Sequence, residues 1–432
     1  MKILLIGSGA REHALAWKLK SSDLTEELWL WPGSPVMARL GQRLDMGNDA
    51  RWEDIARYAK NQGIDFVIVG PEQPLEDGFA DACQLLSLPC FGPVQAAARL
   101  ESSKAFSKDV MAAAGIPTAA FFVAEGEAQC RARALECLDR TKGVVIKASG
   151  LASGKGVFVC FDKTAVDEGI ERLYRSGMAK AAETVVIEEV LRGRECSFFV
   201  FLGQGEPTPL GFAVDHKRLS DGDLGPNTGG MGCYTPVPWL PADAGDQVMA
   251  VVVKPLLAEL QKRGITYTGC LYVGLMWNDE GFAVVEFNAR LGDPEAEVLA
   301  LQDKRDWARL MASKVGLLPL EDEKFLNQAK ENSGASVAVV LASSCYPYGE
   351  TKTETYTLSH QQFQNQSKEL ASFAAAVRSH GDDLVTGKGR MVTVVGHGET
   401  FAKAREKTYA HIKSMTRDWQ GVQFRNDIGS GV

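Results

Sequence analysis

The chain has 432 residues, too many for one ordinary hydrophobic core, so two to four domains are expected. Its 45% hydrophobic and 24% charged residues are typical of a globular protein, and no apolar stretch is long enough to span a membrane. The net charge of −8 argues against a general polyanion binder, so we expect neither a nucleic-acid nor a membrane partner. Nine cysteines without a CxxC pair indicate free thiols in a reducing compartment, which predicts a cytoplasmic protein.

The first hundred residues alternate short apolar strands with helices, which predicts βαβ units and a parallel sheet. The first strand runs into Gly7-Ser8-Gly9, at the start of a helix expected over 11–20. This turn is similar to a dinucleotide-binding motif, but Glu12 replaces its third glycine and Trp31 ends the second strand without an acid for ribose. A nicotinamide cofactor is therefore not expected. The turn can seat a phosphate on free N–H groups, or it is a plain tight turn. The strands are expected at 3–6, 28–31 and 66–69.

A helix over 102–114 ends at Gly115-Ile116-Pro117 and predicts a connection between domains. Beyond it, Lys147 closes an apolar strand and precedes a Gly/Ala/Ser loop that contains Lys155, a pattern that fits a phosphate clamp. The loop is not a Walker A motif, because it lacks that motif's first glycine and its final Ser or Thr. A surface hairpin is the alternative interpretation. Further strands are expected at 144–147, 156–160, 185–188, 197–202, 270–277, 281–287, 336–341 and 390–395, with a last helix over 399–415.

Two segments carry the strongest chemical signals. Residues 215–232 read DHKRLSDGDLGPNTGGMG, where charged side chains adjoin a glycine-rich run that favours close approach to a ligand over a plain mobile loop. Near 284–294, period-2 alternation places Glu286, Asn288 and Arg290 on one face of a strand. A carboxylate and an amide oxygen suit magnesium carried with nucleotide phosphates, and the arginine can bind a carboxylate or phosphate. A solvated sheet face is the alternative.

Taken in order, the motifs resemble the phosphoribosylamine–glycine ligase family of the ATP-grasp superfamily. The matching segments are GSGAREHALAWK, VGPEQPLEDG, FGP, SKAF, VIKASGLASGKGV, VIEEVLRGRECSF, DHKR, GPNTGGMGCYTP, YTGCLYVGLM and EFNARLGDPE. The resemblance implies ATP-dependent joining of glycine to 5-phosphoribosylamine in purine synthesis. We expect this single activity, since nothing follows the C-terminal domain, and a monomer rather than an oligomer. The resemblance also implies an α/β and α+β multidomain fold. The expected parts are a Rossmann-like N-terminal domain (1–102), a linker helix (103–119), ATP-grasp small (120–195) and large (196–320) subdomains, and a small α+β C-terminal domain (321–432).

The resemblance further implies a site for ATP and for Mg²⁺ or Mn²⁺. The metal ligands would be Glu286 and Asn288, and the catalytic residues Arg290 and Lys155. The ATP-binding residues would be Lys104, Lys147, Glu188, Glu189, Val190 and Glu195, with the end of the strand near adenine and Glu195 near ribose. The substrate-binding residues would be Gly9, Arg11, Glu12, Asp215, Lys217, Arg218, Gly229, Gly230, Arg290, Asp293 and Pro294. Among these, Asp215 and the Gly229-Gly230 backbone are candidates for glycine's ammonium and carboxylate groups, together with Arg290.

The chain departs from the family pattern in two places. EFNCRFGDPE followed by a glutamine is expected, whereas Ala289, Leu291 and Glu297 stand at these positions. Residues 371–377 read ASFAAAV where a HAGT-like turn is usual, and 386–390 recover only the hairpin that follows it. These departures leave open another carboxylate–amine ligase of the same fold. A noncatalytic nucleotide-binding regulator also stays open, and a nicotinamide dehydrogenase is the least favoured function.

Overall fold

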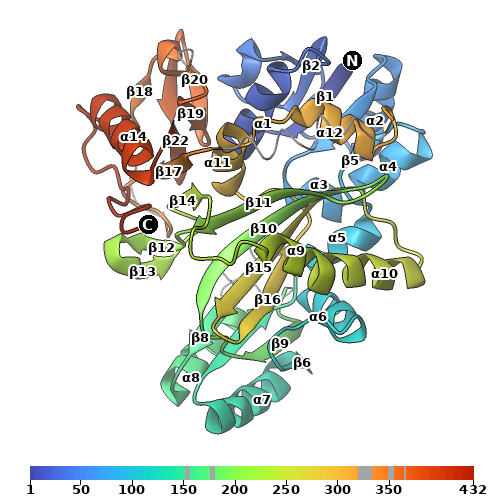
Figure 1. The fold of residues 1–432 in the computed structure, drawn as a ribbon, viewed down its shortest axis with the longest axis vertical. Helices are drawn as coiled ribbons and strands as arrows, with labels where there is room; N and C mark the ends of the chain where they lie inside the picture. Colours follow the sequence, from blue (N-terminus) through green and yellow to red (C-terminus); the bar gives the residue numbers. More distant parts are fainter. Residues whose placement is uncertain (151–155, 176–180, 320–332, 349–354, 364–365) are drawn as a thin grey trace.

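The computed structural model describes residues 1–150, 156–175, 181–319, 333–348, 355–363 and 366–432. The N-terminal sheet and the C-terminal elements lie at one end of the molecule, and a small lobe formed by β6–β9, α7 and α8 lies at the other (Figure 1). Predicted Lys155 lies outside the described residues. Among the described helices, none combines the length and the apolar character needed to cross a membrane.

The N-terminal region confirms the predicted parallel sheet, with strand order β3-β2-β1-β4-β5. Its central strands β1 and β4 are short, apolar and buried, as in other parallel sheets, whereas the edge strand β3 is polar and exposed. The elements are β1 (Lys2–Gly7), α1 (Ala10–Lys20), β2 (Glu27–Pro32), β3 (Gln42–Arg43), α2 (Trp52–Asn61), β4 (Phe66–Val69), α3 (Glu72–Glu76), α4 (Phe79–Leu85), β5 (Cys90–Phe91), α5 (Gln95–Ser102) and α6 (Lys104–Ala113).

The small lobe is a four-stranded antiparallel sheet in the order β6-β9-β7-β8, with α7 and α8 packed against it. Apolar residues of both helices share one core with β7 and β9, which holds those two strands rigidly. The elements are β6 (Phe121–Glu125), α7 (Gly126–Thr141), β7 (Val144–Ala148), β8 (Val157–Cys160), α8 (Lys163–Arg175) and β9 (Thr184–Glu189).

The rest of the chain is organised around one eight-stranded sheet, ordered β16-β15-β10-β11-β14-β17-β22-β19. Strands on both sides of the domain boundary expected at 320–321 belong to this sheet, because β14 pairs with both β11 and β17. Its strands are β10 (Arg194–Leu202), β11 (Thr208–Asp215), β14 (Gly232–Thr235), β15 (Gly269–Asn278), β16 (Gly281–Asn288), β17 (Ala335–Ala342), β19 (Leu370–Ala374) and β22 (Arg390–Gly398). The associated helices are α9 (Ala244–Val248), α10 (Lys254–Lys262), α11 (Glu295–Gln302), α12 (Trp307–Lys314) and α14 (Phe401–Met415), with a π-helical turn at Met249–Val253 joining α9 to α10.

Two small sheets complete the described structure. Strands β12 (Arg218–Ser220) and β13 (Leu224–Asn227) form a hairpin, so the glycine-rich run is partly strand and only residues 228–231 connect β13 to β14. Strands β18 (Thr357–Leu358), β20 (Val377–His380) and β21 (Asp383–Thr386) form the second sheet.

The N-terminal region is joined to the rest of the molecule by helix α1. Residues of α1 share a hydrophobic core with α11 and α12, and the N–H of Ala374 on β19 donates to His13 Nδ1 at 3.0 Å. These contacts place the turn at 7–9 close to the segment that follows β16. Positions far apart in the sequence are therefore brought to one region of the fold.

Candidate active site

Strand β16 presents the predicted metal pair. Glu286 and Asn288 lie two residues apart on one face, opposite Gly274 and Tyr272 of β15. Asn288 Nδ2 lies 3.5 Å from Glu286 Oε1. Arg290 lies beyond the end of the strand, so the alternation that pairs Glu286 with Asn288 does not extend to it.

Lysines from three other elements surround Glu286, and we call the group of Lys104, Lys108, Lys147, Lys217, Glu188, Glu195, Glu286 and Asn288 the cationic cluster. Burial would raise the pKa of Glu286, but the positive charges of Lys217, Lys147 and Lys104 outweigh burial and lower it. Burial in turn lowers the pKa of Lys104, and the charge of Glu286 opposes that effect. The carboxylate is therefore ionised at neutral pH, in a setting suited to polyphosphate.

Helix α6 is joined to the end of β7 by hydrogen bonds that bring two of these lysines together. The N–H of Lys104 donates to the carbonyl of Ser149 at 2.9 Å, and the Ser149 hydroxyl accepts from the N–H of Ala105 at 3.0 Å. Ser103 caps the same helix by accepting from Phe106 N–H. Lys104 and Lys147 are thus held close to the same site by backbone geometry.

Glu188 on β9 contacts two lysines in the interior. Its carboxylate oxygens lie 2.8 Å from Lys147 Nζ and 3.2 Å from Lys108 Nζ, and the side chain is 3% exposed. Lys108 also donates to the hydroxyl of Thr118, at 2.5 Å. Burial lowers the pKa of Lys108 to about 8, against the raising effect of Glu188. The side chain that we predicted to contact nucleotide is therefore engaged in a buried ion-pair network.

A second ion pair adjoins this network, between Glu195 on β10 and Lys217. Burial lowers the pKa of Lys217, but Glu195, Tyr272 and Glu286 raise it by more. The backbone of Lys217 is also fixed, because its carbonyl accepts from the N–H and the hydroxyl of Thr228 at 2.7 and 2.8 Å. Lys217 therefore links the charged strand ends to the glycine-rich run.

The cationic cluster fits a hard divalent cation that shares its ligands with phosphate groups. One ionised carboxylate and one amide oxygen on the same strand face are ligands that Mg²⁺ accepts, with the remaining positions left to phosphate and water. Across the described ranges, no group of three or more His, Cys, Asp or Glu side chains is arranged to hold a metal ion. The residues present therefore fit a metal carried by a nucleotide better than a closed protein cage.

Beside this cluster, the end of β11 meets the glycine-rich run and the turn after β16. A Cβ added to Gly230 would lie 2.7 Å from Asp215 Oδ1 and 2.7 Å from Pro294 Cδ, and the Gly230 φ is +107°. Only glycine fits this position without strain, so the three segments approach each other because residue 230 has no side chain. The structure therefore brings together the predicted residues Asp215, Gly230 and Pro294.

Four carboxylates gather here, and we call Asp215, Asp293, Glu295 and Glu297 the acidic cluster. Burial and the neighbouring Glu295 raise the pKa of Asp215 well above its ordinary value. Burial and Asp293 do the same for Glu297, which is 0% exposed and has no hydrogen-bond partner on either carboxylate oxygen. Asp215 Oδ1 also has no partner. Uncompensated acids of this kind favour a cationic ligand.

The side chain of Glu12 forms hydrogen bonds within the N-terminal turn and helix α1. Glu12 Oε2 accepts from Gly9 N–H at 2.7 Å, and Oε1 accepts from Arg11 Nε at 2.6 Å. A Cβ on Gly7 or Gly70 would collide with the Glu12 side chain, so the glutamate fills the space between these glycines. Glu12 therefore caps helix α1 in place of the missing third glycine.

Arg11 and Arg290 converge on Glu72 of helix α3. Glu72 Oε2 lies 3.8 Å from Arg11 Nη2 and 3.4 Å from Arg290 Nε, while Arg290 Nη2 lies 2.8 Å from Glu101 Oε1. Glu101 also accepts from Ala289 N–H at 2.8 Å. Burial would raise the pKa of Glu72, but the two arginines lower it. Arg290 thus faces carboxylates of the N-terminal region.

The remaining predicted residues make their own contacts outside both clusters. Arg218 donates to Gly225 O at 2.7 Å within the β12–β13 hairpin, and Glu189 pairs with Arg140 at 2.8 Å. Val190 directly follows β9, and Gly229 faces the C-terminal region. Of these, only Gly229 reaches the acidic cluster, through Arg390, which also binds Asp293.

Sequence reasoning missed several residues of the site. Lys108 follows Lys104 by four positions on one helix face, a spacing that could have revealed it. Glu72 and Arg390 stand inside motifs whose patterns indicate only turns, and Glu297 stands out only as a departure from the family pattern. Glu101 and Tyr346 gave no sequence signal, because they become partners of the site only through packing. The missed residues are Glu72, Glu101, Lys108, Glu295, Tyr346 and Arg390.

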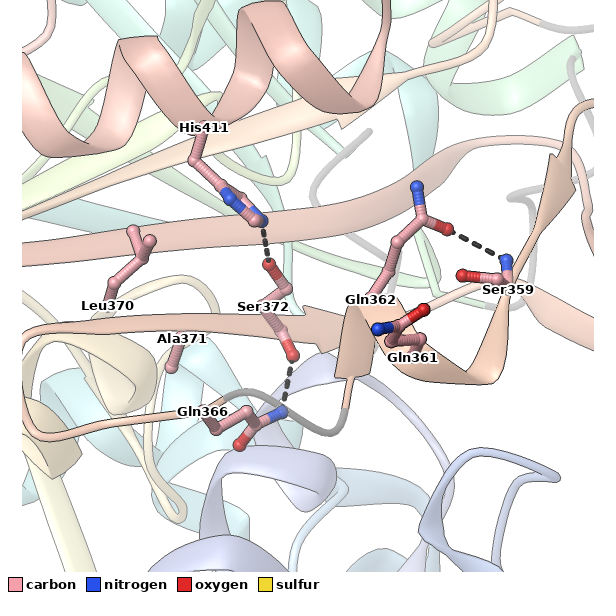
Figure 2. Close-up of a pocket in the computed structure, with 8 residues that line it drawn as sticks. All are labelled: Ser359, Gln361, Gln362, Gln366, Leu370, Ala371, Ser372 and His411. Atoms are coloured by element: carbon pink, nitrogen blue, oxygen red, sulfur yellow. Dashed lines mark hydrogen bonds between the residues drawn. The ribbon is translucent and has the colours of Figure 1, made fainter.

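A cavity of about 210 Å³ lies away from these clusters, where β19 and α14 meet the side of the chain formed by Ser359, Gln361, Gln362 and Gln366. Figure 2 shows the imidazole of His411 directed at Ser372, whose hydroxyl lies 3.1 Å from His411 Nε2, and Gln366 donating to the Ser372 carbonyl. Burial lowers the pKa of His411, so this cavity is uncharged at neutral pH. None of the predicted site residues lines it.

A small antiparallel lobe adjoins a larger sheet, and Lys147 of the lobe lies beside the end of β16 that carries Glu286, an arrangement of the ATP-grasp class. The chain matches the family models for phosphoribosylglycinamide synthetase: the N domain over residues 1–101, the ATP-grasp (A) domain over 102–296 and the C domain over 336–431. The chain belongs to the phosphoribosylamine–glycine ligase family.

Relatives and solved structures agree with this assignment. The phosphoribosylamine–glycine ligase of Rhizobium meliloti is 37% identical over 432 residues, covering 99% of this chain and 98% of the relative. That of Mycobacterium leprae is 39% identical over 435 residues, with the same shares covered. The crystal structure of the Thermotoga maritima phosphoribosylamine–glycine ligase superposes with a TM-score of 0.79 at 30% identity, covering 99% of this chain and 100% of that one.

A more distant structure shares the fold alone. The biotin carboxylase domain of Hydrogenobacter thermophilus 2-oxoglutarate carboxylase, solved with MgADP, ADP and bicarbonate, has a TM-score of 0.71 at 16% identity. It covers 98% of this chain and 91% of that chain. The predicted multidomain α/β and α+β architecture is thereby confirmed.

Proposed function

We propose that the chain joins glycine to 5-phosphoribosylamine at the expense of ATP, giving glycinamide ribonucleotide, ADP and phosphate in purine biosynthesis. The family membership supports this activity. The observation that carries it is the position of Lys217, which pairs with Glu195 and whose charge acts on both Glu286 of the lysine-rich cluster and Asp215 of the acidic one. The first suits a nucleotide triphosphate and the second suits the ammonium group of an amino acid.

The first chemical step activates glycine. The carboxylate oxygen of glycine attacks the γ-phosphorus of ATP, the bond to the β–γ bridging oxygen breaks, and glycyl phosphate and ADP form. Lys104 and Lys147 offset the negative charge on the phosphoryl oxygens, held in place by α6 and by Glu188. Glu286 and Asn288 would hold Mg²⁺ or Mn²⁺, which supplies further charge neutralisation when bound.

In the second step the amine of phosphoribosylamine attacks the carbonyl carbon of glycyl phosphate. Phosphate leaves with the electron pair of the C–O bond, and the amine loses a proton as the amide forms. The acyl phosphate is open to hydrolysis, so the site must exclude water. The glycine-rich run beside Asp215 is the segment that we assign to covering it.

The remaining assignments extend this proposal. Asp215 would accept the ammonium group of glycine, and the backbone of Gly229 and Gly230 would meet its carboxylate. Arg11, Arg290 and the turn at Gly9 would face phosphoribosylamine, with Glu12 shaping that turn, while Asp293 and Pro294 would border the acceptor. Glu189, Val190 and Glu195 would contact adenosine, Lys217 and Arg218 would stabilise the acceptor side, and Lys155 would act on phosphate.

We also propose the five-part division of the chain that its sequence suggests, a cytoplasmic location, and a monomer without nucleic-acid or membrane partners. Limited proteolysis and sedimentation would test the division and the monomer. Cleavage outside the connecting segments, or a concentration-dependent increase in mass, would contradict them.

The activity is tested by ATP consumption with glycine and freshly prepared phosphoribosylamine, compared with a panel of different acids and amines. We expect turnover only when both substrates are present, with product mass equal to glycinamide ribonucleotide. Turnover with a different acid and none with glycine would support another carboxylate–amine ligase instead. Nucleotide binding without any turnover would support a regulatory protein, and tight binding of NAD would revive the dehydrogenase hypothesis.

A further inference from the structure

The guanidinium of Arg390, at the start of β22, contacts both the glycine-rich run and Asp293 of the acidic cluster. Its Nη1 donates to the carbonyl of Gly229 at 2.6 Å and to the carbonyl of Asp293 at 2.7 Å, and it lies 3.0 Å from Asp293 Oδ1. The side chain is 22% exposed, so these charge-assisted bonds are partly shielded from water. One residue of the C-terminal region therefore connects the glycine-rich run to the turn that follows β16.

Tyr346 completes the hold on the glycine-rich run. The N–H of Gly229 donates to Tyr346 Oη at 2.8 Å. A Cβ on Gly229 would lie 3.3 Å from both Arg390 Cζ and Tyr346 Oη, so the two side chains pack directly on this residue. Tyr346 is itself held, since Gln423 donates to its carbonyl at 3.3 Å. Both backbone polar groups of Gly229 are bound by the C-terminal region.

These contacts determine the distance between the two sides of the acidic cluster. Gly229 precedes Gly230 and Asp293 precedes Pro294, and a Cβ on Gly230 would lie 2.7 Å from both Asp215 Oδ1 and Pro294 Cδ. Movement of Arg390 would release both segments at the same time. Its positive charge also lowers the pKa of Asp215 and of Glu297, against the larger raising effect of their burial.

We propose that Arg390, assisted by Tyr346, is a positioning residue for the substrate glycine. It holds residues 229–230 against the 293–294 turn. The inference rests on the proposed function, because it assumes that glycine binds at Asp215. It gives the C-terminal region a direct part in amino-acid recognition, although that region departs from the family pattern. Because the lysines and the metal pair are held by other elements, the nucleotide side should not depend on Arg390.

The test compares steady-state constants for Arg390→Met, Arg390→Lys and Tyr346→Phe, with Arg378→Met as control, since Arg378 is an exposed arginine on β20. Loss of charge-assisted hydrogen bonds worth ~1.5–3 kcal/mol predicts a rise of about 10- to 100-fold in the KM for glycine in Arg390→Met. Arg390→Lys keeps the charge without the planar group and should give a smaller rise, and Tyr346→Phe about 3- to 5-fold. The KM for ATP and all constants of the control should remain unchanged.

An unchanged KM for glycine in Arg390→Met would overturn the proposal, and so would an equal rise for ATP or a rise confined to phosphoribosylamine. A structural readout separates this inference from the activity itself. Hydrogen exchange of the peptide covering 224–232, measured in ligand-free protein, should quicken in Arg390→Met and Tyr346→Phe but not in the control. Unaltered exchange would overturn the proposed holding role of Arg390 and Tyr346, even if wild-type turnover with glycine is found. Faster exchange without any glycine turnover would support the holding of residues 229–230 by Arg390 and Tyr346. It would contradict the proposed function and, with it, the assignment of this site to glycine.

If Arg390→Met fails to fold, Arg390→Lys and Tyr346→Phe test the proposal through the same two measurements, the KM for glycine and the hydrogen exchange of residues 224–232. Both keep the size of the side chain close to the original. A normal glycine KM and normal exchange in these two variants would also overturn the proposal.

Discussion

The cationic and acidic clusters lie side by side but are built in different ways. Most of the cationic cluster stands on strands β7, β9, β10 and β16 and on helix α6, and its main charges are paired: Glu188 with Lys147 and Lys108, Glu195 with Lys217. The acidic cluster stands largely where elements end, and Asp215 Oδ1 and both oxygens of Glu297 have no partner. The charges of the first cluster are largely paired before a ligand arrives, whereas the second holds buried carboxyl groups with unpartnered oxygens, whose ionised form a cationic ligand would stabilise.

This difference indicates how the work is divided. A polyphosphate needs fixed positive charge, and ordered strands supply it without reorganisation when the ligand binds. An amino acid brings its own positive charge, so uncompensated carboxylates favour it, at a cost in stability when it is absent. Variants in the cationic cluster should therefore lower turnover most. Variants in the acidic cluster should change the KM for glycine or the stability of the ligand-free protein.

Glu286→Gln should have the largest effect. Removing the only carboxylate of the metal pair forfeits several kcal/mol of charge stabilisation, which predicts a loss of about 1,000-fold in kcat/KM for ATP. Steady-state kinetics across a magnesium titration would measure it. Glu280→Gln, in the exposed turn of the same hairpin, should behave as wild type. Activity of Glu286→Gln close to that of wild type would show that the metal pair is misassigned.

Asp215→Asn should change the KM for glycine and leave the KM for ATP as it is. Loss of a charge-assisted contact to ammonium predicts a rise of about 10- to 100-fold in the KM for glycine, with the KM for ATP unchanged. Because burial and Glu295 raise the pKa of Asp215, the wild-type carboxyl keeps its proton to higher pH than usual. The wild-type KM for glycine should therefore fall as pH rises, and this dependence should weaken in the variant. An equal effect on ATP would erase the distinction between the two clusters, and Asp279→Asn serves as an exposed control.

Glu297→Gln should have the smallest effect on turnover and a visible effect on stability. The pKa of Glu297 is raised, so the neutral form is favoured on folding; its stabilisation is full below the unfolded pKa of about 4.3 and is lost as pH rises toward the folded pKa. Glutamine does not titrate. The variant should gain about 1–2 kcal/mol over wild type at pH 8, and less at pH 5.

Urea denaturation at both pH values would measure this difference. The matched substitution Glu183→Gln, in the small lobe just before β9, should change stability little at either pH. A gain for Glu297→Gln that is equal at pH 5 and pH 8 would contradict the assignment of a raised pKa.

The sequence alone determined the features that depend on neighbours along the chain. Runs such as Ile3–Ile6 and Val144–Lys147 predicted buried strands correctly, because an apolar run ended by a turn has few other solutions. Period-2 alternation correctly paired Glu286 with Asn288 on one face. The order of motifs along the chain predicted the family, which the comparisons confirmed.

Only the tertiary structure decided which distant groups share a site. The sequence predicted a nucleotide contact for Glu188 but gave no sign of the two lysines that it binds, and Arg390 lies 161 residues from the glycine that it holds. The expected boundary at 320–321 is crossed by a continuous sheet because β14 pairs with strands on both sides. Local patterns set the period of a helix or strand, whereas burial, ion pairing and shared sheets depend on how separate segments pack, and neighbouring residues carry no record of that packing.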